Sequence, residues 1–361
     1  MDFGLSEDQE LFKTTVRRFL AEQCPTERVR EIMETDSAHD PDLWAGLCEL
    51  GVPAMIVPEE AGGLGSDLLD LALVAEEMGY AATPGPFLGN AMATVALAGS
   101  DAEETVRPWL ERIAAGEAIA TVAIGEAGSQ WAPDALQSRV EGNRLSGDKP
   151  MVPSADVAEA IVVAARDEDG PGLWLIEREH AGVTVRSLKV NDMTRRLSDI
   201  ELRDVEAVRL GGSDLLARTI DAGLILVAAD AYGGSSRCLE MTRSYALERE
   251  QFGQVIGAFQ AVKHQLADMA AALEPAMSLY WYAAHAFDHI TDQAPRHAAM
   301  AKAHLTDLYD WITRMSIELH GGIGFTWEFD LHLWFRRAIF DRGFLGDATY
   351  QRARAADMAG W

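Results

Sequence analysis

The sequence contains no stretch of about 20 consecutive apolar residues, the length that a helix needs to cross a bilayer. The segment from Met1 to Glu10 also lacks the basic region followed by an apolar region that secretory signals carry. Both absences argue against a membrane-spanning or secreted protein. We therefore expect a cytoplasmic location.

Cysteine is scarce too, with only Cys24, Cys48 and Cys238 in 361 residues, and these are widely separated. Such spacing supports neither a disulfide framework nor a cysteine metal site. Basic stretches are absent, and the formal net charge is −26. Nucleic acids and anionic membranes would be repelled by this charge, so neither is expected as a partner. We interpret the acidic excess as a solvated surface that keeps an oligomer soluble.

The length is too great for one small core, and the residue patterning predicts three parts. Residues 1–118 read mostly as helix, beginning with a capping-box pattern at Ser6 to Gln9. A middle β domain is predicted over 119–212, where short β-branched or alternating runs occur without intervening helices. These runs, which predict an antiparallel sheet or small barrel, are residues 160–165, 173–176, 183–185 and 199–205.

Helical periodicity returns in residues 213–361, which predicts a C-terminal four-helix bundle. After a first long helix, the predicted helices of this bundle cover 262–287, 296–319 and 331–356. The fold class expected from the sequence is therefore α+β, with a helical domain, an antiparallel β domain and a helical bundle in that order.

Four motifs occur along the chain: LSEDQELF at 5–12, VPEEAGGLGSDLLDLALVAEEMG at 57–79, REQFGQVIGAFQ at 249–260 and HGGIGFTWE at 320–328. In order and spacing they resemble the acyl-CoA dehydrogenase family, over essentially the whole chain. PGPF at 84–87 and GFTWEFDLHLWFRRA at 324–338 are most similar to the bacterial branch that degrades steroid side chains, several members of which contain two different subunits. The resemblance implies an acyl-CoA dehydrogenase-like fold, FAD at a subunit interface and acyl-CoA substrates.

The resemblance also implies which residues hold the cofactor. In this family the arginine, phenylalanine and glutamine of the third motif, and the glycines of the fourth, bind the FAD of a neighbouring subunit. The matching residues here are Arg249, Phe252, Gln260, Gly321, Gly322 and Gly324. A guanidinium group suits phosphate oxygens, and an aromatic ring can pack on a flat ring system. Glycines can bring backbone amides close to a ligand.

Each of these residues also has a purely structural interpretation. Arg249 could form a surface salt bridge with Glu248 or Glu250, and Phe252 could belong to a helix-packing core. One glycine of the fourth motif could simply end a helix. His320, at the start of that motif, is read as a helix-end histidine with satisfied hydrogen bonds rather than as a catalytic group.

The sequence lacks an acid at both positions where the family carries its catalytic glutamate. These positions correspond to Leu345 and Gly223, and neither residue can accept a proton. A general base must lie within hydrogen-bonding reach of the proton that it removes. Three further departures affect residues that serve a subunit's own flavin: Leu224 replaces an arginine, KPMVPSA at 149–155 retains only Ser154 as a hydroxyl, and IGEAGSQWAPD at 124–134 replaces TEPGAGSD.

These differences lead to a hypothesis: the chain is the subunit without a base in a heteromeric dehydrogenase, for which a tetramer is expected. Its partner would be a homologous subunit that carries the glutamate. A self-sufficient homo-oligomer with a displaced acid is a rival hypothesis, for which Asp347 and Asp230 are the nearest candidates. Both also have structural interpretations, Asp347 as a helix N-cap and Asp230 as a buried acid with a partner. The sequence is also compatible with a flavin-free scaffold, and with a flavin oxidase or monooxygenase on the same fold.

Overall fold

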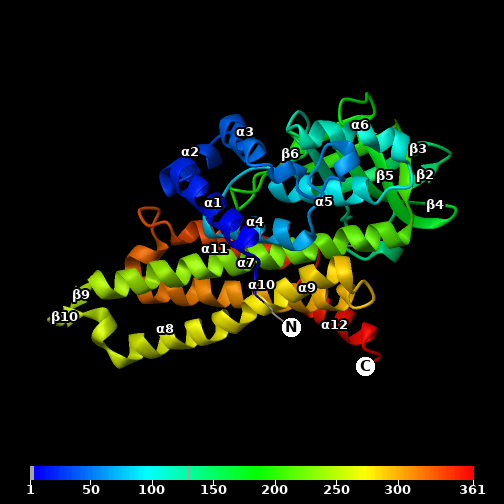
Figure 1. Ribbon diagram of the computed structural model, residues 1–361. Coiled ribbons are helices and arrows are strands. Elements are labelled where there is room, and N and C mark those ends of the chain that lie inside the picture. Colours follow the sequence, from blue (N-terminus) through cyan, green and yellow to red (C-terminus); the bar gives the residue numbers. More distant parts are fainter. Residues whose placement is uncertain (1–3, 129–130) are drawn as a thin grey trace. The chain divides into compact units, whose positions relative to one another are not determined.

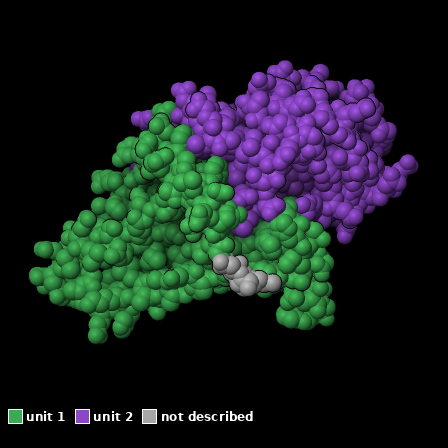
Figure 2. Space-filling view, viewed as in Figure 1, with its two compact units in different colours: residues 1–29, 72–83, 224–361 green, residues 30–71, 84–223 purple. Residues whose placement is uncertain are grey.

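The computed structural model describes residues 4–128 and 131–361, and Figure 1 shows the course of the chain. Ser129 and Gln130, in the loop that follows Ile124, lie outside the described residues. Two compact units are formed, one by residues 1–29, 72–83 and 224–361 and the other by residues 30–71 and 84–223 (Figure 2). Each unit thus combines segments that are distant in the sequence.

The helices that precede the sheet are α1 (Glu7–Gln23), α2 (Thr26–Met33), α3 (Pro41–Glu49), α4 (Leu68–Tyr80), α5 (Phe87–Ala98) and α6 (Glu103–Ala114). The predicted capping box begins α1: the Gln9 amide donates to Ser6 Oγ at 3.2 Å, and the Ser6 amide donates to Gln9 Oε1 at 3.0 Å. Between α3 and α4 the proline- and glycine-rich segment forms only the short 3-10 helices η1 (Val52–Ala54) and η2 (Glu59–Ala61).

The strands are β1 (Ala120–Ala123), β2 (Arg139–Glu141), β3 (Arg144–Pro153), β4 (Ala160–Asp167), β5 (Gly170–Glu177), β6 (Val183–Ser187), β7 (Leu197–Glu206) and β8 (Val208–Gly211). They form one sheet in the order β6-β7-β3-β2-β4-β5-β8, with β1 added beside β4. Strand β4 pairs in parallel with β1 and β2, whereas the other pairings are antiparallel. All four predicted β runs lie in strands of this sheet, and alternate residues such as Ile161, Val163 and Trp174 fill its core.

The C-terminal segment contains α7 (Ser213–Glu248), the hairpin β9 (Glu250–Gln251) and β10 (Gln254–Val255), α8 (Gln260–Leu273), α9 (Met277–His289), α10 (Ala294–His320), α11 (Leu331–Gly343) and α12 (Ala348–Met358). Two predicted helices were wrong in extent. The helix predicted over 262–287 is divided between α8 and α9 at Pro275, which cannot donate a helical hydrogen bond. The helix predicted over 331–356 is divided between α11 and α12 by a turn at Leu345 and Gly346, both with positive φ.

Helices α4 and α7 pack closely because glycines face the neighbouring backbone. A Cβ atom at Gly79 would lie 2.0 Å from the Asp230 carbonyl oxygen, and one at Gly233 would lie 1.8 Å from that of Glu76. Such distances exclude any side chain at either position. The helix–sheet–helix order confirms the α+β class, whereas the division after residues 118 and 212 stays a prediction. In the described part of the chain, no helix combines the length and apolar character required to span a bilayer.

Candidate functional site

The first predicted cofactor segment lies where α7 ends. Figure 1 shows the β9–β10 hairpin at the far end of α7 and α8. Phe252 and Gly253 form its two-residue turn with φ of +53° and +81°, the positive values that tight hairpin turns require. The Phe252 side chain is 93% exposed, and its ring contacts that of Phe259 edge-on at 6.2 Å. A phenylalanine is thus held in a left-handed turn with almost no burial in its own chain, which contradicts the helix-core interpretation.

Arg249 stands at the base of this hairpin. Its backbone amide donates to the Tyr245 carbonyl at 2.8 Å, and its own carbonyl accepts from the Ile256 amide at 2.7 Å. The side chain is exposed and, within the described residues, forms no hydrogen bond or ion pair. The alternative interpretation, a surface salt bridge with Glu248 or Glu250, is therefore wrong. The guanidinium group is available to an external anion.

Gln260 begins α8 and is also exposed. It follows the short helix η4 (Ile256–Ala258), so it lies a few residues beyond the hairpin on the same connection between α7 and α8. Its position at the first turn of a helix leaves the side-chain amide facing solvent. Gln260 therefore can donate to or accept from a group outside its own chain.

The three predicted glycines follow α10, within the 3-10 helix η6 (Gly321–Phe325), and they differ in what the fold requires of them. Gly321 caps α10 with φ +65° and ψ −140°, a conformation that essentially only glycine adopts. A Cβ atom at Gly324 would lie 2.7 Å from the Ile317 carbonyl oxygen, so packing requires a glycine there. Gly322 has neither constraint, and no atom lies within 4 Å of a Cβ built at Gly321 or Gly322. The backbone at 321–322 is therefore open to a ligand.

An aromatic cluster joins the two motifs. The Tyr245 ring stacks on His320 with centroids 4.2 Å apart, and Phe329 contacts His320 at 4.6 Å and Tyr245 at 6.1 Å. His320 Nδ1 donates to the Ser316 carbonyl at 2.7 Å, as expected for a helix-end histidine, whereas Nε2 has no hydrogen-bond partner within the described residues. The expectation of satisfied hydrogen bonds is thus met at one ring nitrogen only, and burial lowers the pKa of the ring. The end of α7 and the glycine turn thus belong to one local structure.

At the first vacant glutamate position, Leu345 lies in the turn between α11 and α12. The side chain is 1% exposed, and φ is +59°, which costs a leucine roughly 1–2 kcal/mol. Gln351 Nε2 donates to the Leu345 carbonyl at 2.5 Å, and the buried Lys302 Nζ donates to the carbonyls of Gly346 and, at 2.8 Å, Arg342. The turn is therefore fixed by hydrogen bonds from α10 and α12, but it presents no acid.

At the second vacant position, Gly223 is buried within α7. Asp230, two turns further along α7, forms a bidentate ion pair with Arg337 of α11 through contacts of 2.8 and 2.6 Å. Asp347 accepts a hydrogen bond from the Tyr350 amide at 2.8 Å and caps α12. Both acids therefore have structural roles, as a partnered buried acid and as a helix N-cap.

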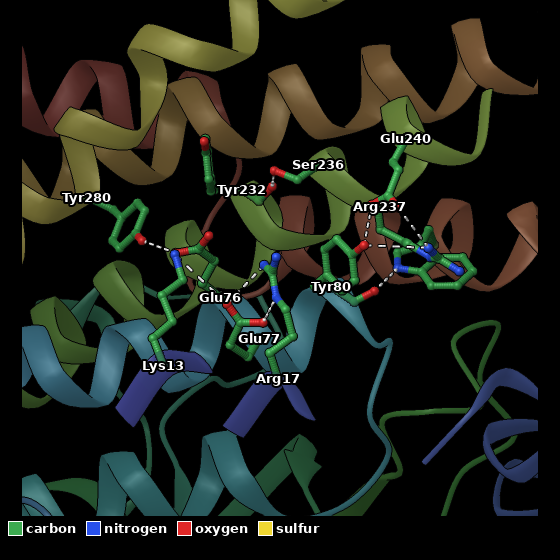
Figure 3. Close-up of polar contacts among 11 residues, drawn as sticks. Lys13, Arg17, Glu76, Glu77, Tyr80, Tyr232, Ser236, Arg237, Glu240 and Tyr280 are labelled. Atoms are coloured by element: carbon green, nitrogen blue, oxygen red, sulfur yellow. Dashed lines mark hydrogen bonds and ion pairs between the residues drawn. The ribbon is translucent and has the colours of Figure 1, made fainter. Parts of the chain in front are cut away.

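Sequence reasoning missed two further buried acids. Figure 3 shows Glu76 and Glu77 on α4 facing Lys13 and Arg17 of α1. Lys13 Nζ lies 2.6 Å from Glu76, which also accepts from the Tyr280 hydroxyl, and Arg17 donates to both oxygens of Glu77 at 2.6 and 3.0 Å. Burial raises the pKa of Glu77. Two adjacent acids in a mostly apolar helix were the available signal, and both acids are paired with this chain's own groups.

In the other unit, the residues of the two segments that depart from the family form a separate buried pair. Lys149 Nζ lies 2.6 Å from Glu126 Oε1, and both side chains are at most 3% exposed. The Glu126 carboxylate also accepts from the Ser138 amide at 3.0 Å. Ser154 is 6% exposed with φ +48°, and its amide donates to the Arg196 carbonyl at 2.9 Å. No cluster of three or more potential metal ligands occurs among the residues that the structure describes.

Comparison with known families gives two matches. The model of the acyl-CoA dehydrogenase N-terminal domain matches residues 6–117, and that of the C-terminal domain matches residues 211–359. Together these matches cover well over half of the chain.

Similar proteins and structures point to the same family. Acyl-CoA dehydrogenase IpdE2 of Mycolicibacterium smegmatis is 32% identical over 97% of this chain and 98% of its own length. The solved structure of the Tcur3481–Tcur3483 steroid acyl-CoA dehydrogenase is 31% identical with a TM-score of 0.92, covering 98% of each chain. The ChsE4–ChsE5 complex from Mycobacterium tuberculosis is 28% identical with a TM-score of 0.90, covering 100% of this chain and 99% of that one.

Proposed function

The chain belongs to the FAD-dependent acyl-CoA dehydrogenase family, and within it we propose that this chain is the subunit that completes a partner's FAD site without supplying a catalytic base. The reaction of the assembled enzyme would be α,β-dehydrogenation of an acyl-CoA thioester. Bound FAD supplies the hydride acceptor for this chemistry. The partner would be a homologous subunit that carries the glutamate.

The observation that carries the proposal is the pair of unsatisfied groups at the end of α7. Arg249 has no ion pair or hydrogen bond from its side chain among the described residues, and Phe252 is 93% exposed in a left-handed turn. Burying a phenylalanine side chain stabilises an assembly by roughly 1.5–3 kcal/mol. A guanidinium group recognises pyrophosphate oxygens with two parallel hydrogen bonds. These groups gain their partners only when another chain and its dinucleotide are present.

The residues present fit FAD as half of a site. Arg249 would hold the pyrophosphate, Phe252 would pack on a flat surface, and Gln260 would hydrogen bond at the polar edge. The open backbone at Gly321 and Gly322 allows close approach of a ligand. Gly324 contributes indirectly, because its packing against the end of α10 fixes the shape of the turn.

The absence of a base in this chain supports the second half of the proposal. Leu345 and Gly223 cannot accept the α proton. Asp230 is paired with Arg337, and Asp347 caps a helix. An acid already engaged in a buried ion pair is poorly placed to approach a substrate carbon. The proton acceptor would therefore come from the partner subunit.

The relatives support a heteromeric assembly. Two of the solved structures contain a pair of named chains, ChsE4 with ChsE5 and Tcur3481 with Tcur3483, and the second pair is described as a steroid enzyme. We propose a heterotetramer that acts on a bulky, steroid-derived acyl-CoA.

The test is co-expression with candidate homologous subunits that carry glutamate at either vacant position. We expect the purified complex to contain flavin and to dehydrogenate acyl-CoA, and the isolated chain to do neither. Arg249→Ala should lower the flavin content of the complex. The matched control is Arg243→Ala, an exposed arginine in α7, the helix that ends just before Arg249, and it should leave flavin content unchanged.

Three outcomes would contradict the proposal in different ways. Full flavin occupancy and turnover by the isolated chain would show a self-sufficient dehydrogenase. Flavin content that is equal in the Arg249→Ala and unmodified complexes would show a scaffold without a cofactor role. Oxygen consumption during turnover would show an oxidase or monooxygenase.

A further inference from the structure

We propose that Tyr245, His320 and Phe329 are positioning residues that hold Arg249 and the glycine turn in a fixed arrangement, so that both act on one dinucleotide. The inference rests on the proposed function. It concerns residues that contact the cofactor-binding segments of this chain rather than the cofactor itself.

The cluster connects elements that are far apart in the sequence. Tyr245 lies in the last turn of α7, His320 ends α10, and Phe329 follows the glycine turn. The Tyr245 and His320 rings are nearly parallel, with an interplanar angle of 25°, and Phe329 contacts both rings at steeper angles. The Tyr245 hydroxyl also donates to the His320 carbonyl at 3.4 Å. Three rings and one hydrogen bond thus join the two helix ends.

Two of the three rings are directly connected to a group proposed to bind FAD. The Arg249 amide donates to the Tyr245 carbonyl, one helical turn away. His320 is bonded covalently to Gly321, whose φ and ψ set the direction of the turn. A shift of the Tyr245 ring relative to His320 would therefore change the distance between Arg249 and the open backbone at Gly321. Ligand contacts that depend on two donors are sensitive to such changes.

The histidine acts in this cluster as an uncharged aromatic ring. It is 4% exposed, burial lowers its pKa, and Nδ1 donates to the Ser316 carbonyl. Nε2 has no hydrogen-bond partner within the described chain. Because stacking rather than charge is the proposed contribution, phenylalanine should replace the histidine in function. Alanine should not.

The cluster borders an open pocket at the protein surface. Tyr245 and Phe329 line this pocket of about 250 Å³, together with Met241, Ser244 and Glu248 among others. Because the pocket leaves space beside the two rings, removing one ring of the cluster would leave the others less restrained.

The experiment measures the Kd for FAD of the co-purified complex after flavin removal, together with its Tm. We expect Tyr245→Leu and His320→Ala to weaken FAD binding roughly tenfold, because each removes two aromatic contacts. His320→Phe should retain near-normal affinity. The matched control is Tyr309→Leu, since Tyr309 is fully buried between the same two helices, with its hydroxyl 2.2 Å from a Cβ built at Gly234.

A positioning role requires that FAD affinity and thermal stability respond differently. Tyr309→Leu should lower Tm at least as much as Tyr245→Leu while leaving the Kd for FAD within about twofold. The inference is overturned if both variants change affinity in proportion to Tm, or if His320→Phe binds FAD as weakly as His320→Ala. If Tyr309→Leu does not fold, Phe329→Leu against Phe340→Leu provides the same comparison. Loss of FAD in Arg249→Ala with no effect of Tyr245→Leu would refute this inference alone, whereas no effect of either variant would refute the proposed function.

Discussion

Substituting Asp230 tests whether this residue is the displaced catalytic base of the rival hypothesis or only the structural partner of Arg337 in a buried ion pair. Both side chains are at most 4% exposed, and the carboxylate accepts from Nε and Nη2 of the guanidinium at 2.8 and 2.6 Å. Arg337 Nη1 also donates to the Thr83 carbonyl at 3.0 Å. Replacing Asp230 with asparagine keeps the size of the side chain and removes its charge.

The expected cost follows from the burial of the remaining partner. Removing one member of a buried ion pair typically destabilises a protein by about 3–5 kcal/mol, because the other charge is left uncompensated. At about 2.1 cal/mol/K of unfolding entropy per residue, each kcal/mol in a chain of 361 residues corresponds to roughly 1.3 °C in Tm, so Asp230→Asn should lower Tm by about 4–7 °C. The double variant Asp230→Leu, Arg337→Met should recover much of this loss, since no charge remains buried.

The assay compares Tm, flavin content and turnover per flavin in the purified complex. Our reasoning predicts a large loss of Tm, with turnover per flavin within about tenfold of the unmodified complex at temperatures where the variant is folded. A general base contributes typically 10²–10⁴-fold, so a base at Asp230 would give the opposite pattern. Stable folding with turnover reduced by about 10²-fold or more would refute the structural assignment. Asp347→Asn is the control, and it should cost well below about 1 kcal/mol, because asparagine caps a helix about as well as aspartate.

Further predictions concern the other buried charges and the glycine turn. Lys149→Met should lower the free energy of unfolding, measured with denaturant, by about 3–5 kcal/mol, and adding Glu126→Gln should restore much of that loss. A double variant whose loss equals the sum of the two single losses would contradict the pairing. Gly321→Ala should cost of order 1–3 kcal/mol through φ alone and weaken FAD binding, whereas Gly322→Ala should weaken FAD binding without this cost, because its Cβ would enter only the space proposed for the ligand; unchanged FAD affinity in Gly322→Ala would contradict the role proposed for Gly322. Burial lowers the pKa of Lys302 from 10.5 to about 8, so the folded state binds fewer protons between these values. Lys302 should therefore contribute a rise of up to about 3 kcal/mol to the free energy of unfolding from pH 8 to 10.5, and Lys302→Met should remove that contribution but not the similar one from Lys149, whose pKa burial also lowers to about 8.

Local features of the fold followed from neighbouring residues. The capping box at Ser6, the β runs and the break before α4 depend on side chains within a few positions of one another, and all were predicted correctly. The end of α7 at the third motif was also visible in the sequence. Helix lengths were less predictable, because periodicity continues through Pro275 and through the turn at Leu345.

The candidate site also combines features that the sequence predicted with features that it did not. The motif residues Arg249, Phe252 and Gly321 were named from the resemblance of their motifs to the family, and their role in binding FAD stays a prediction. The exposure of their side chains could not be predicted from the sequence. That Phe252 is 93% exposed while Arg249 lacks a side-chain partner within the described chain depends on how the hairpin leaves the helices around it.

The sequence by itself therefore determined the family, the order of helices and strands, and the lack of a glutamate at Leu345 and Gly223. Only the tertiary structure decided what the remaining acids do: Asp230 meets Arg337 across 107 positions, and Glu76 meets Tyr280 across 204. A carboxylate's role depends on which charge or hydroxyl lies within about 3 Å, and such distances are set by helix packing rather than by neighbours in the chain.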